Sequence, residues 1–130
     1  TSLTPHLVID EINEAINESK AKKMYVCNLF TQPGETDDYK VSDHLELLLR
    51  YINNIDVVVA NDKKIPSNIA RKYSREEEKD CVKIDKNNID KLGVKLIGDK
   101  IYHISKVDGT IKHDPLKTAY LIFSYLMDEV

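Results

Sequence analysis

The chain has 130 residues, which is enough to bury one hydrophobic core and is close to the most common domain size. Its 19 Lys and Arg against 22 Asp and Glu give a net charge of −3, and the lysines are scattered, which disfavours a nucleic-acid-binding protein. No apolar run approaches the roughly 18 residues that span a bilayer, and residues 1–5 lack the basic and apolar regions of a secretory signal.

The two cysteines, Cys27 and Cys81, lie far apart and neither belongs to a Cys-x-x-Cys pair. Cys27 falls in a predicted buried strand, where cysteine behaves as a small hydrophobe. We therefore expect no disulfide framework and a cytoplasmic protein. Thr1 is followed almost at once by a helical pattern, which favours a piece of a larger protein.

The first half of the chain alternates helical and strand patterns. Apolar spacing predicts a helix over residues 5–19, and the nearly continuous apolar run 24–30 predicts a strand covered on both faces. A second helix is predicted over 41–53, and three consecutive valines indicate a second buried strand over 55–60. Residues 67–78 are predicted to be helical, with a thin apolar stripe.

The second half continues the alternation with shorter elements. We predict a short strand over 82–85, and a short helix over 86–92 that ends at Gly93. Strands are predicted over 94–97 and 101–105, with a turn at Gly98-Asp99 between them. The alternation indicates an α/β fold in three layers, with a mostly parallel sheet flanked by helices.

The last predicted helix begins after Asp114, which acts as its N-cap, with Pro115 in the first turn. Its apolar side chains recur at helical spacing, and we assign them to the core. They are Leu116, Ala119, Tyr120, Phe123, Leu126 and Met127.

A polar loop, residues 31–39, connects the predicted strand 24–30 to the helix that starts near Ser42. In open α/β folds ligands bind outside the carboxyl ends of the strands, so this loop lies where such folds bind ligands. Its carboxylates favour the hydroxyl groups of a ribose or sugar, or a phosphate bridged by Mg²⁺, over a bare anion. The same residue types are ordinary in loops and N-caps, so composition leaves a structural role equally open.

Three further polar residues need an explanation. Asn28 lies inside an apolar run, and its amide needs either a structural or a ligand partner because an unpaired buried amide is costly. His44 and His113 are interpreted as structural unless the fold directs them at a ligand. The chain has no nucleophile motif, no metal-type cluster and no glycine-rich phosphate loop, so we expect the phosphate-binding groups to lie outside it.

The residues of this region resemble the signature of the YvcK proteins, or gluconeogenesis factors, which form one superfamily with CofD, the phospholactate transferase. The match rests on residues 23–29, 31–37, Tyr39 and 42–45, with weaker similarity elsewhere. It implies that residues 1–130 form a single α/β domain that is the C-terminal portion of a larger Rossmann-like domain. Asp38 stands where the family has glycine, and aspartate adopts a positive φ more readily than most residues.

The resemblance implies a non-catalytic bacterial protein that binds a nucleotide or nucleotide sugar, foremost a UDP-sugar, and regulates carbon metabolism and cell shape. The alternative is a CofD-like transferase that moves a phospho-substituted group from a nucleotide donor with Mg²⁺. A half-domain that mediates homodimer contacts is the third interpretation. No residue is assigned a catalytic role, and the residues that match the family's site are Asn28, Thr31, Gln32, Gly34, Glu35, Thr36, Asp37, Ser42, Asp43 and His44.

Overall fold

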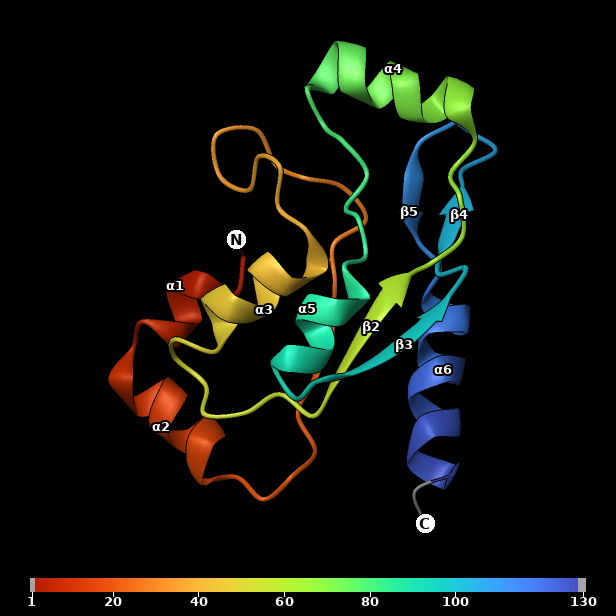
Figure 1. Ribbon diagram of the computed structural model, residues 1–130. Coiled ribbons are helices and arrows are strands. Elements are labelled where there is room, and N and C mark those ends of the chain that lie inside the picture. The colour runs from red at the N-terminus through yellow and green to blue at the C-terminus, as the bar shows by residue number, and fades with distance from the viewer. Residues whose placement is uncertain (1, 129–130) are drawn as a thin grey trace.

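In a computed structural model that describes residues 2–128, a parallel three-stranded sheet lies between helices on both faces (Figure 1). The strand order is β1 (Met24–Val26), β2 (Val57–Asn61) and β3 (Lys95–Asp99), with Met24 opposite Val57 and Val57 opposite Lys95. The predicted α/β fold with a mostly parallel sheet is therefore confirmed.

The helices divide between the two faces of the sheet (Figure 1). One face carries α1 (Thr4–Leu7), α2 (Asp10–Glu18), α3 (Val41–Leu48) and α5 (Lys86–Lys91). The other face carries α6 (Pro115–Asp128). The helix α4 (Ser67–Glu77) lies beyond the carboxyl end of β2, near the two-stranded antiparallel ribbon of β4 (Tyr102–Ile104) and β5 (Ile111–His113).

Strand β2 separates two hydrophobic cores because successive side chains of a strand point to opposite faces. Val58 and Ala60 pack in a cluster that includes Leu45 of α3 and Ile89 of α5. Val57 and Val59 pack in the second cluster, with side chains of α6 and the residues that lead into β4. The valine-rich run thus forms a strand that is buried on both faces, as its composition predicts.

The predicted helix over 5–19 is wrong in one respect, because it is broken into α1 and α2 at Ile9, whose backbone is extended. The side-chain amide of Asn13 donates to the carbonyl of Leu7 at 3.0 Å and so satisfies a group that the break exposes. The helix predicted over 41–53 ends early, at Leu48. Beyond it, Asn17 of α2 bonds the backbone of Tyr51 and Asn53 and holds that segment in a non-helical path.

Two strand predictions also need correction. The first strand ends at Val26, because after Cys27 the chain leaves the sheet and Phe30 instead forms an antiparallel bridge with Cys81. Residues 82–85 form no strand, because the pairing of this segment with the chain after β1 is an isolated bridge at Cys81.

The predicted turn at Gly98-Asp99 is wrong, because both residues belong to β3, where they pair with Ala60 and Asn61. The glycine is required by its neighbour: a Cβ on Gly98 would come within 2.7 Å of the Asp62 carboxylate. The short strand β5 was not predicted from the sequence. Among the helices of the described residues, none has both the length and the apolar composition that crossing a bilayer requires.

The last helix begins as predicted, with the Asp114 carboxylate accepting a hydrogen bond from the Lys117 amide at 3.0 Å. Its orientation differs from the prediction. The side chains that contact the core are Leu121, Ile122 and Tyr125, whereas most of the stripe assigned to the core points away from the sheet.

Candidate functional site

The polar loop 31–39 is held at both ends by the segment 80–85. At one end Thr31 and Asp80 exchange two hydrogen bonds, of 2.8 and 3.0 Å, the second of them to the Thr31 hydroxyl. At the other end the Asp85 carboxylate accepts from the Ser42 amide at 3.0 Å and from the Ser42 hydroxyl. The loop is therefore fixed to the body of the fold.

Side chains within the loop mostly stabilise its own backbone. The buried Thr36 hydroxyl accepts from the Gln32 amide at 2.8 Å, and the Asp37 carboxylate accepts from the Gly34 amide at 2.7 Å. Asp43 caps α3 by accepting from the amide of Lys40 at 2.8 Å. These contacts give Thr36, Asp37 and Asp43 structural roles, and their predicted contact with a ligand stays a prediction.

The residue before Tyr39, where the family that the sequence resembles has glycine, has a backbone conformation that favours glycine. Asp38 adopts φ 59°, in the left-handed region that favours glycine, and Gly34 lies there as well at φ 77°. Aspartate tolerates this conformation better than most residues, so the substitution preserves the loop's path.

Asn28, just beyond β1, is the predicted residue that lies most centrally. It lines three hollows, of about 660, 410 and 240 Å³, which open at the carboxyl end of the sheet. Its side-chain amide forms no hydrogen bond with any residue in the described range 2–128. An amide that both donates and accepts is therefore available to a ligand at the position where parallel sheets bind ligands.

The largest of these hollows also receives Asn61, the last residue of β2. The Asn61 amide nitrogen donates to the carbonyl of Lys63 at 2.7 Å, but its buried Oδ1 has no partner within residues 2–128. Amide groups from the ends of two adjacent parallel strands, Asn28 and Asn61, thus face the same space.

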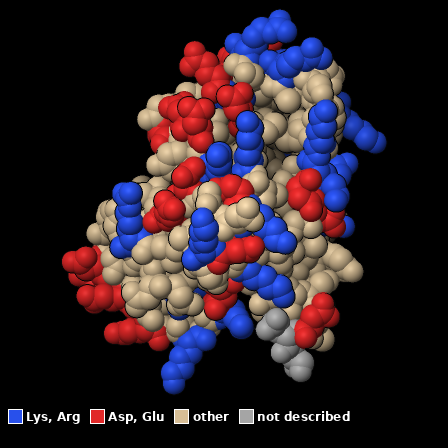
Figure 2. All heavy atoms as spheres, viewed as in Figure 1, with Lys and Arg blue, Asp and Glu red and all other residues tan. Residues whose placement is uncertain are grey.

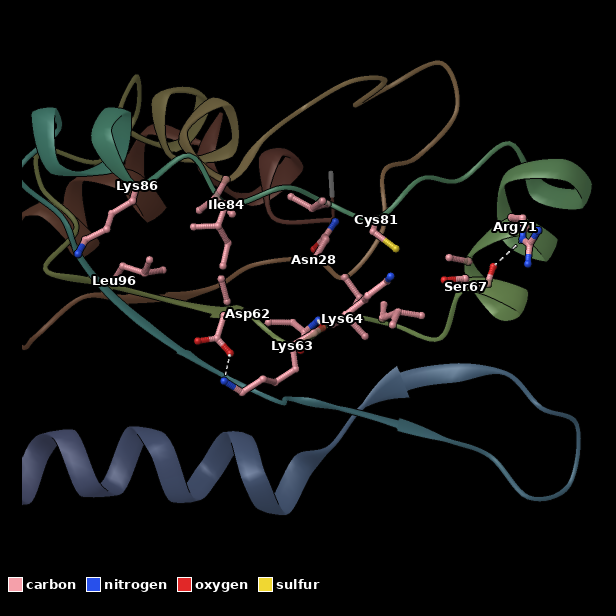
Figure 3. A pocket seen from close by; sticks show the side chains of 17 residues that line it. Asn28, Asp62, Lys63, Lys64, Ser67, Arg71, Cys81, Ile84, Lys86 and Leu96 are labelled. Atoms are coloured by element: carbon pink, nitrogen blue, oxygen red, sulfur yellow. Dashed lines mark hydrogen bonds and ion pairs between the residues drawn. The ribbon is translucent and has the colours of Figure 1, made fainter.

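Basic side chains surround this hollow (Figure 3). Asn28 and Lys64 lie near its middle, with Arg71 of α4 at one end and Lys86 of α5 at the other. Neither Lys64 nor Lys86 forms an ion pair with another described residue, while the Arg71 Nε donates to the carbonyl of Ser67 at 3.2 Å. Four cationic side chains line this hollow along its length, Lys63, Lys64, Arg71 and Lys86, and the expectation that the phosphate-binding groups lie outside this chain stays a prediction.

Sequence reasoning passed over these cations, although one signal was available. Lys63-Lys64 directly follows a buried parallel strand, which is the location where such sheets bind ligands. Arg71 and Lys86 carry no such signal, since they reach the hollow only through the placement of α4 and α5.

The 410 Å³ hollow contains three of the predicted site residues together, Asn28, Thr31 and Gln32. The strand β5 also lines this hollow, and the ring Nε2 of His113, the last residue of that strand, donates to the carbonyl of Cys27 at 3.1 Å. The fold thus brings His113 to the end of β1, where its ring has a backbone partner, and a functional role for it stays untested. Gly34, Glu35, Thr36, Asp37, Ser42 and Asp43 line none of the three hollows that meet at Asn28.

His44 lies beneath this region, on α3, with 3% of its surface exposed. Its ring stacks edge-on against Tyr39 at a centroid distance of 5.3 Å, and its Nε2 has no partner within the described part of the chain. Burial lowers the pKa of His44, and the nearby Asp43 charge offsets this only in part. Burial likewise raises the pKa of Cys27 to about 12, so this thiol stays protonated and is a poor nucleophile.

Metal binding can be assessed from the donor set. Within residues 2–128 there is no group of three or more His, Cys, Asp or Glu side chains that could hold a metal ion. The largest hollow offers one carboxylate, Asp62, which forms an ion pair with Lys63 at 3.3 Å. Because Mg²⁺ is often held by one or two carboxylates together with substrate phosphates, Asp62 is the group here that fits a metal-bound phosphate.

Comparisons with known proteins agree on one group. A family model described as 2-phospho-L-lactate transferase CofD matches residues 1–102. The chain is 35% identical over 130 residues to the gluconeogenesis factor of Bacillus subtilis, covering 98% of this chain and 40% of that protein. It is 33% identical over 124 residues to the gluconeogenesis factor of Halalkalibacterium halodurans, covering 94% and 38%.

A solved structure shows the same fold. A crystal structure from Bacillus halodurans, described as a member of the UPF0052 family, superposes with a TM-score of 0.85 at 32% sequence identity. The superposition covers 92% of this chain and 38% of that one. The chain therefore spans about two-fifths of the length of these relatives.

Proposed function

This chain belongs to the CofD family, and from that membership and the hollow at Asn28 we propose that it binds a nucleotide sugar, with UDP-sugars as the favoured class. Its role is that of a cytoplasmic regulatory protein of carbon metabolism and cell shape, related to the gluconeogenesis factors. The observation that carries the proposal is that the unpaired amide of Asn28 and the partnerless Oδ1 of Asn61 lie in one hollow with cationic side chains.

The two kinds of group fit the two ends of such a ligand. A diphosphate carries negative charge that Lys64, near the middle of the hollow, can neutralise, since it is not engaged in an ion pair with a described residue. The amide of Asn28 can donate to and accept from a base or from sugar hydroxyls, and the Oδ1 of Asn61 can accept. The volume of about 660 Å³ lies within the usual range for small-molecule sites.

Among the described residues that line this hollow no acid–base pair is evident, which favours binding over catalysis. The carboxylate of this hollow, Asp62, is paired with Lys63, and the thiol there, Cys81, has a pKa raised by burial. Membership of the CofD family supports a second candidate function, the transfer of a phospho-substituted group from a nucleotide donor with Mg²⁺, and Asp62 is the carboxylate of this hollow that would help to hold the metal ion. Phosphorus NMR can detect turnover of a UDP-sugar or another nucleotide donor in the presence of Mg²⁺. Such turnover would show that the protein is a transferase and not a non-catalytic regulator.

Binding is best tested by ¹⁵N NMR, which also detects weak association. We expect UDP-glucose to shift the side-chain amide signals of Asn28 and Asn61, and we expect Lys64→Gln to weaken the interaction about 10-fold, because a charge-assisted contact to phosphate is lost. The sequence-based site predicts in addition that Glu35→Ala or Asp37→Ala weakens binding.

Matched controls come from the same elements. Arg71→Gln should weaken binding, whereas Arg75→Gln, one turn further along α4 and outside the hollow, should not. If millimolar UDP-glucose leaves the signals of Asn28 and Asn61 unmoved, or if both arginine variants behave alike, the hollow is not the site.

A further inference from the structure

The smallest of the three hollows that meet at Asn28 contains a second polar side chain without a partner. It has a volume of about 240 Å³ and is bounded by the start of α1, the end of β1 and α3. Because His44 of α3 lines it, we call it the His44 hollow. Sites for whole small molecules measure about 300–1,000 Å³, so this hollow has room for one part of a nucleotide sugar.

The imidazole of His44 has an unmet hydrogen-bonding requirement. Only 3% of the residue's surface is exposed, and its buried Nε2 has no partner within residues 2–128. Burial lowers the pKa of His44, so the ring is neutral at pH 7 and carries one donor and one acceptor. An unpaired buried polar atom costs free energy, and a ligand group in the hollow can supply the missing partner.

The lining of the His44 hollow is polar but uncharged. The Thr4 hydroxyl and the Asn28 amide form no hydrogen bond with another residue in the described range. Leu47 and Leu48 add apolar surface, and none of the described residues that line the hollow is Lys, Arg, Asp or Glu. A sugar ring combines hydroxyl groups at its rim with C–H groups on its faces, which matches this lining. A phosphate would lose its hydration here without gaining a cation.

The neighbouring hollow of about 660 Å³ has the opposite character, and we call it the cationic hollow. Lys and Arg side chains gather over α4, whose Arg71 lines it (Figure 2). Lys64 and Asn28 lie near its middle (Figure 3). Asn28 lines both hollows, while Val41 and His44, three residues apart on α3, line one each. A diphosphate that Lys64 binds therefore lies next to Asn28, and the sugar bonded to that diphosphate is placed to enter the His44 hollow.

We propose that the His44 hollow is the sugar subsite, in which His44 and Asn28 bind sugar hydroxyls while the nucleoside diphosphate occupies the cationic hollow. This assignment rests on the nucleotide-sugar binding proposed above and adds which end of the ligand each hollow receives. It also gives hydroxyl recognition to side chains that are free to perform it, since the carboxylates of Asp37 and Asp43 accept from backbone amides of their own loop.

A comparison of UDP with UDP-glucose tests the subsite, because the two compounds differ by the glucosyl group. In NMR titrations of the 130-residue chain we expect both to shift the side-chain amide signals of Asn28 and Asn61. Only UDP-glucose should shift the ring ¹⁵N signals of His44, which are identified by their loss in His44→Phe. That variant should raise the dissociation constant of UDP-glucose about 10-fold and leave that of UDP unchanged, since one hydrogen bond to a hydroxyl is lost.

A second variant and a control come from α1. Thr4→Val removes a hydroxyl from the same hollow with little change of shape, and it should also weaken the binding of UDP-glucose but not of UDP. It keeps the test decisive if His44→Phe disturbs packing. His6→Phe alters an exposed histidine that lines neither hollow and should leave both dissociation constants unchanged. Circular dichroism of each variant establishes that it is folded.

The outcomes separate the subsite from the proposed function. UDP-glucose that shifts Asn28 and Asn61, but shifts His44 no more than UDP does, would overturn the sugar subsite and leave the nucleotide-sugar site standing. Equal losses for both compounds in His44→Phe and in Thr4→Val would also overturn it. If neither compound moves the signals of Asn28 and Asn61, the proposed function fails, and the sugar subsite fails with it.

Discussion

Replacing Asp85 with alanine should lower the free energy of unfolding by about 3 kcal/mol and release the start of α3 from the segment 80–85. The carboxylate accepts from the amide and the hydroxyl of Ser42, and from the side-chain amide of Asn88 at 3.0 Å. Hydrogen bonds to a charged acceptor contribute more than neutral ones, and removing the acceptor leaves the partly buried Ser42 groups unpaired.

Urea denaturation followed by far-ultraviolet circular dichroism measures this loss, and the chain has no tryptophan to report it by fluorescence. Asp90→Ala is the matched control, because Asp90 lies on α5, the helix that Asp85 precedes, and its exposed side chain should contribute at most about 0.5 kcal/mol to stability. A loss in Asp85→Ala no larger than in Asp90→Ala would show that Asp85 does not anchor the loop.

The same anchor predicts a dependence on acid. Burial acts to raise the pKa of Asp85, but the hydrogen bonds from Ser42 and Asn88 outweigh it and hold the pKa below its ordinary value. The contribution of Asp85 to the free energy of unfolding is therefore complete above the pKa of an aspartate in the unfolded chain, about 3.9, and is lost as the pH falls through the pKa of Asp85 in the folded protein. Asp85→Asn, which does not titrate, should be less stable at neutral pH and should lose less stability in this acidic range.

The architecture could be predicted from the sequence because hydrophobic periodicity reports burial directly. The three valines of β2 require apolar neighbours on both faces, and that requirement alone implies a sheet covered by helices. The orientation of α6 could not be predicted, because this helix is apolar on nearly all sides. Periodicity shows that Tyr120 and Tyr125 lie on different faces but does not show which face meets the sheet.

The candidate site, too, could be predicted from the sequence only in part. The loop's position after β1 follows from the order of the elements, and Asn28 could be singled out because an amide inside an apolar run needs a partner. What the loop's side chains do depends on partners. Asp37 bonds an amide three residues away, whereas Ser42 bonds Asp85, 43 residues distant, and nothing in the sequence pairs them. The cations of the hollow depend on tertiary structure in the same way, since they reach it from α4, α5 and the segment after β2.

His44 should make the protein lose stability as the pH falls below about 6.5. Its buried ring takes up a proton less readily than the same residue in the unfolded chain, and burial is the main reason that its pKa is lowered. The unfolded state therefore binds more protons, and stability declines with falling pH at up to about 1.4 kcal/mol per pH unit until the folded pKa is reached.

His44→Phe should remove this slope, because phenylalanine cannot titrate but keeps a ring against Tyr39 and Tyr25, which lie 5.3 and 6.5 Å from the histidine. Urea denaturation at a series of pH values between about 7.5 and 5.5 measures it, above the range in which most carboxylates titrate. His6→Gln, at an exposed position of α1, should retain the wild-type slope. Equal slopes in wild type and His44→Phe would mean that His44 accepts a proton in the folded state as easily as in the unfolded one. Its unpartnered Nε2 would then be reachable from solvent or from a ligand.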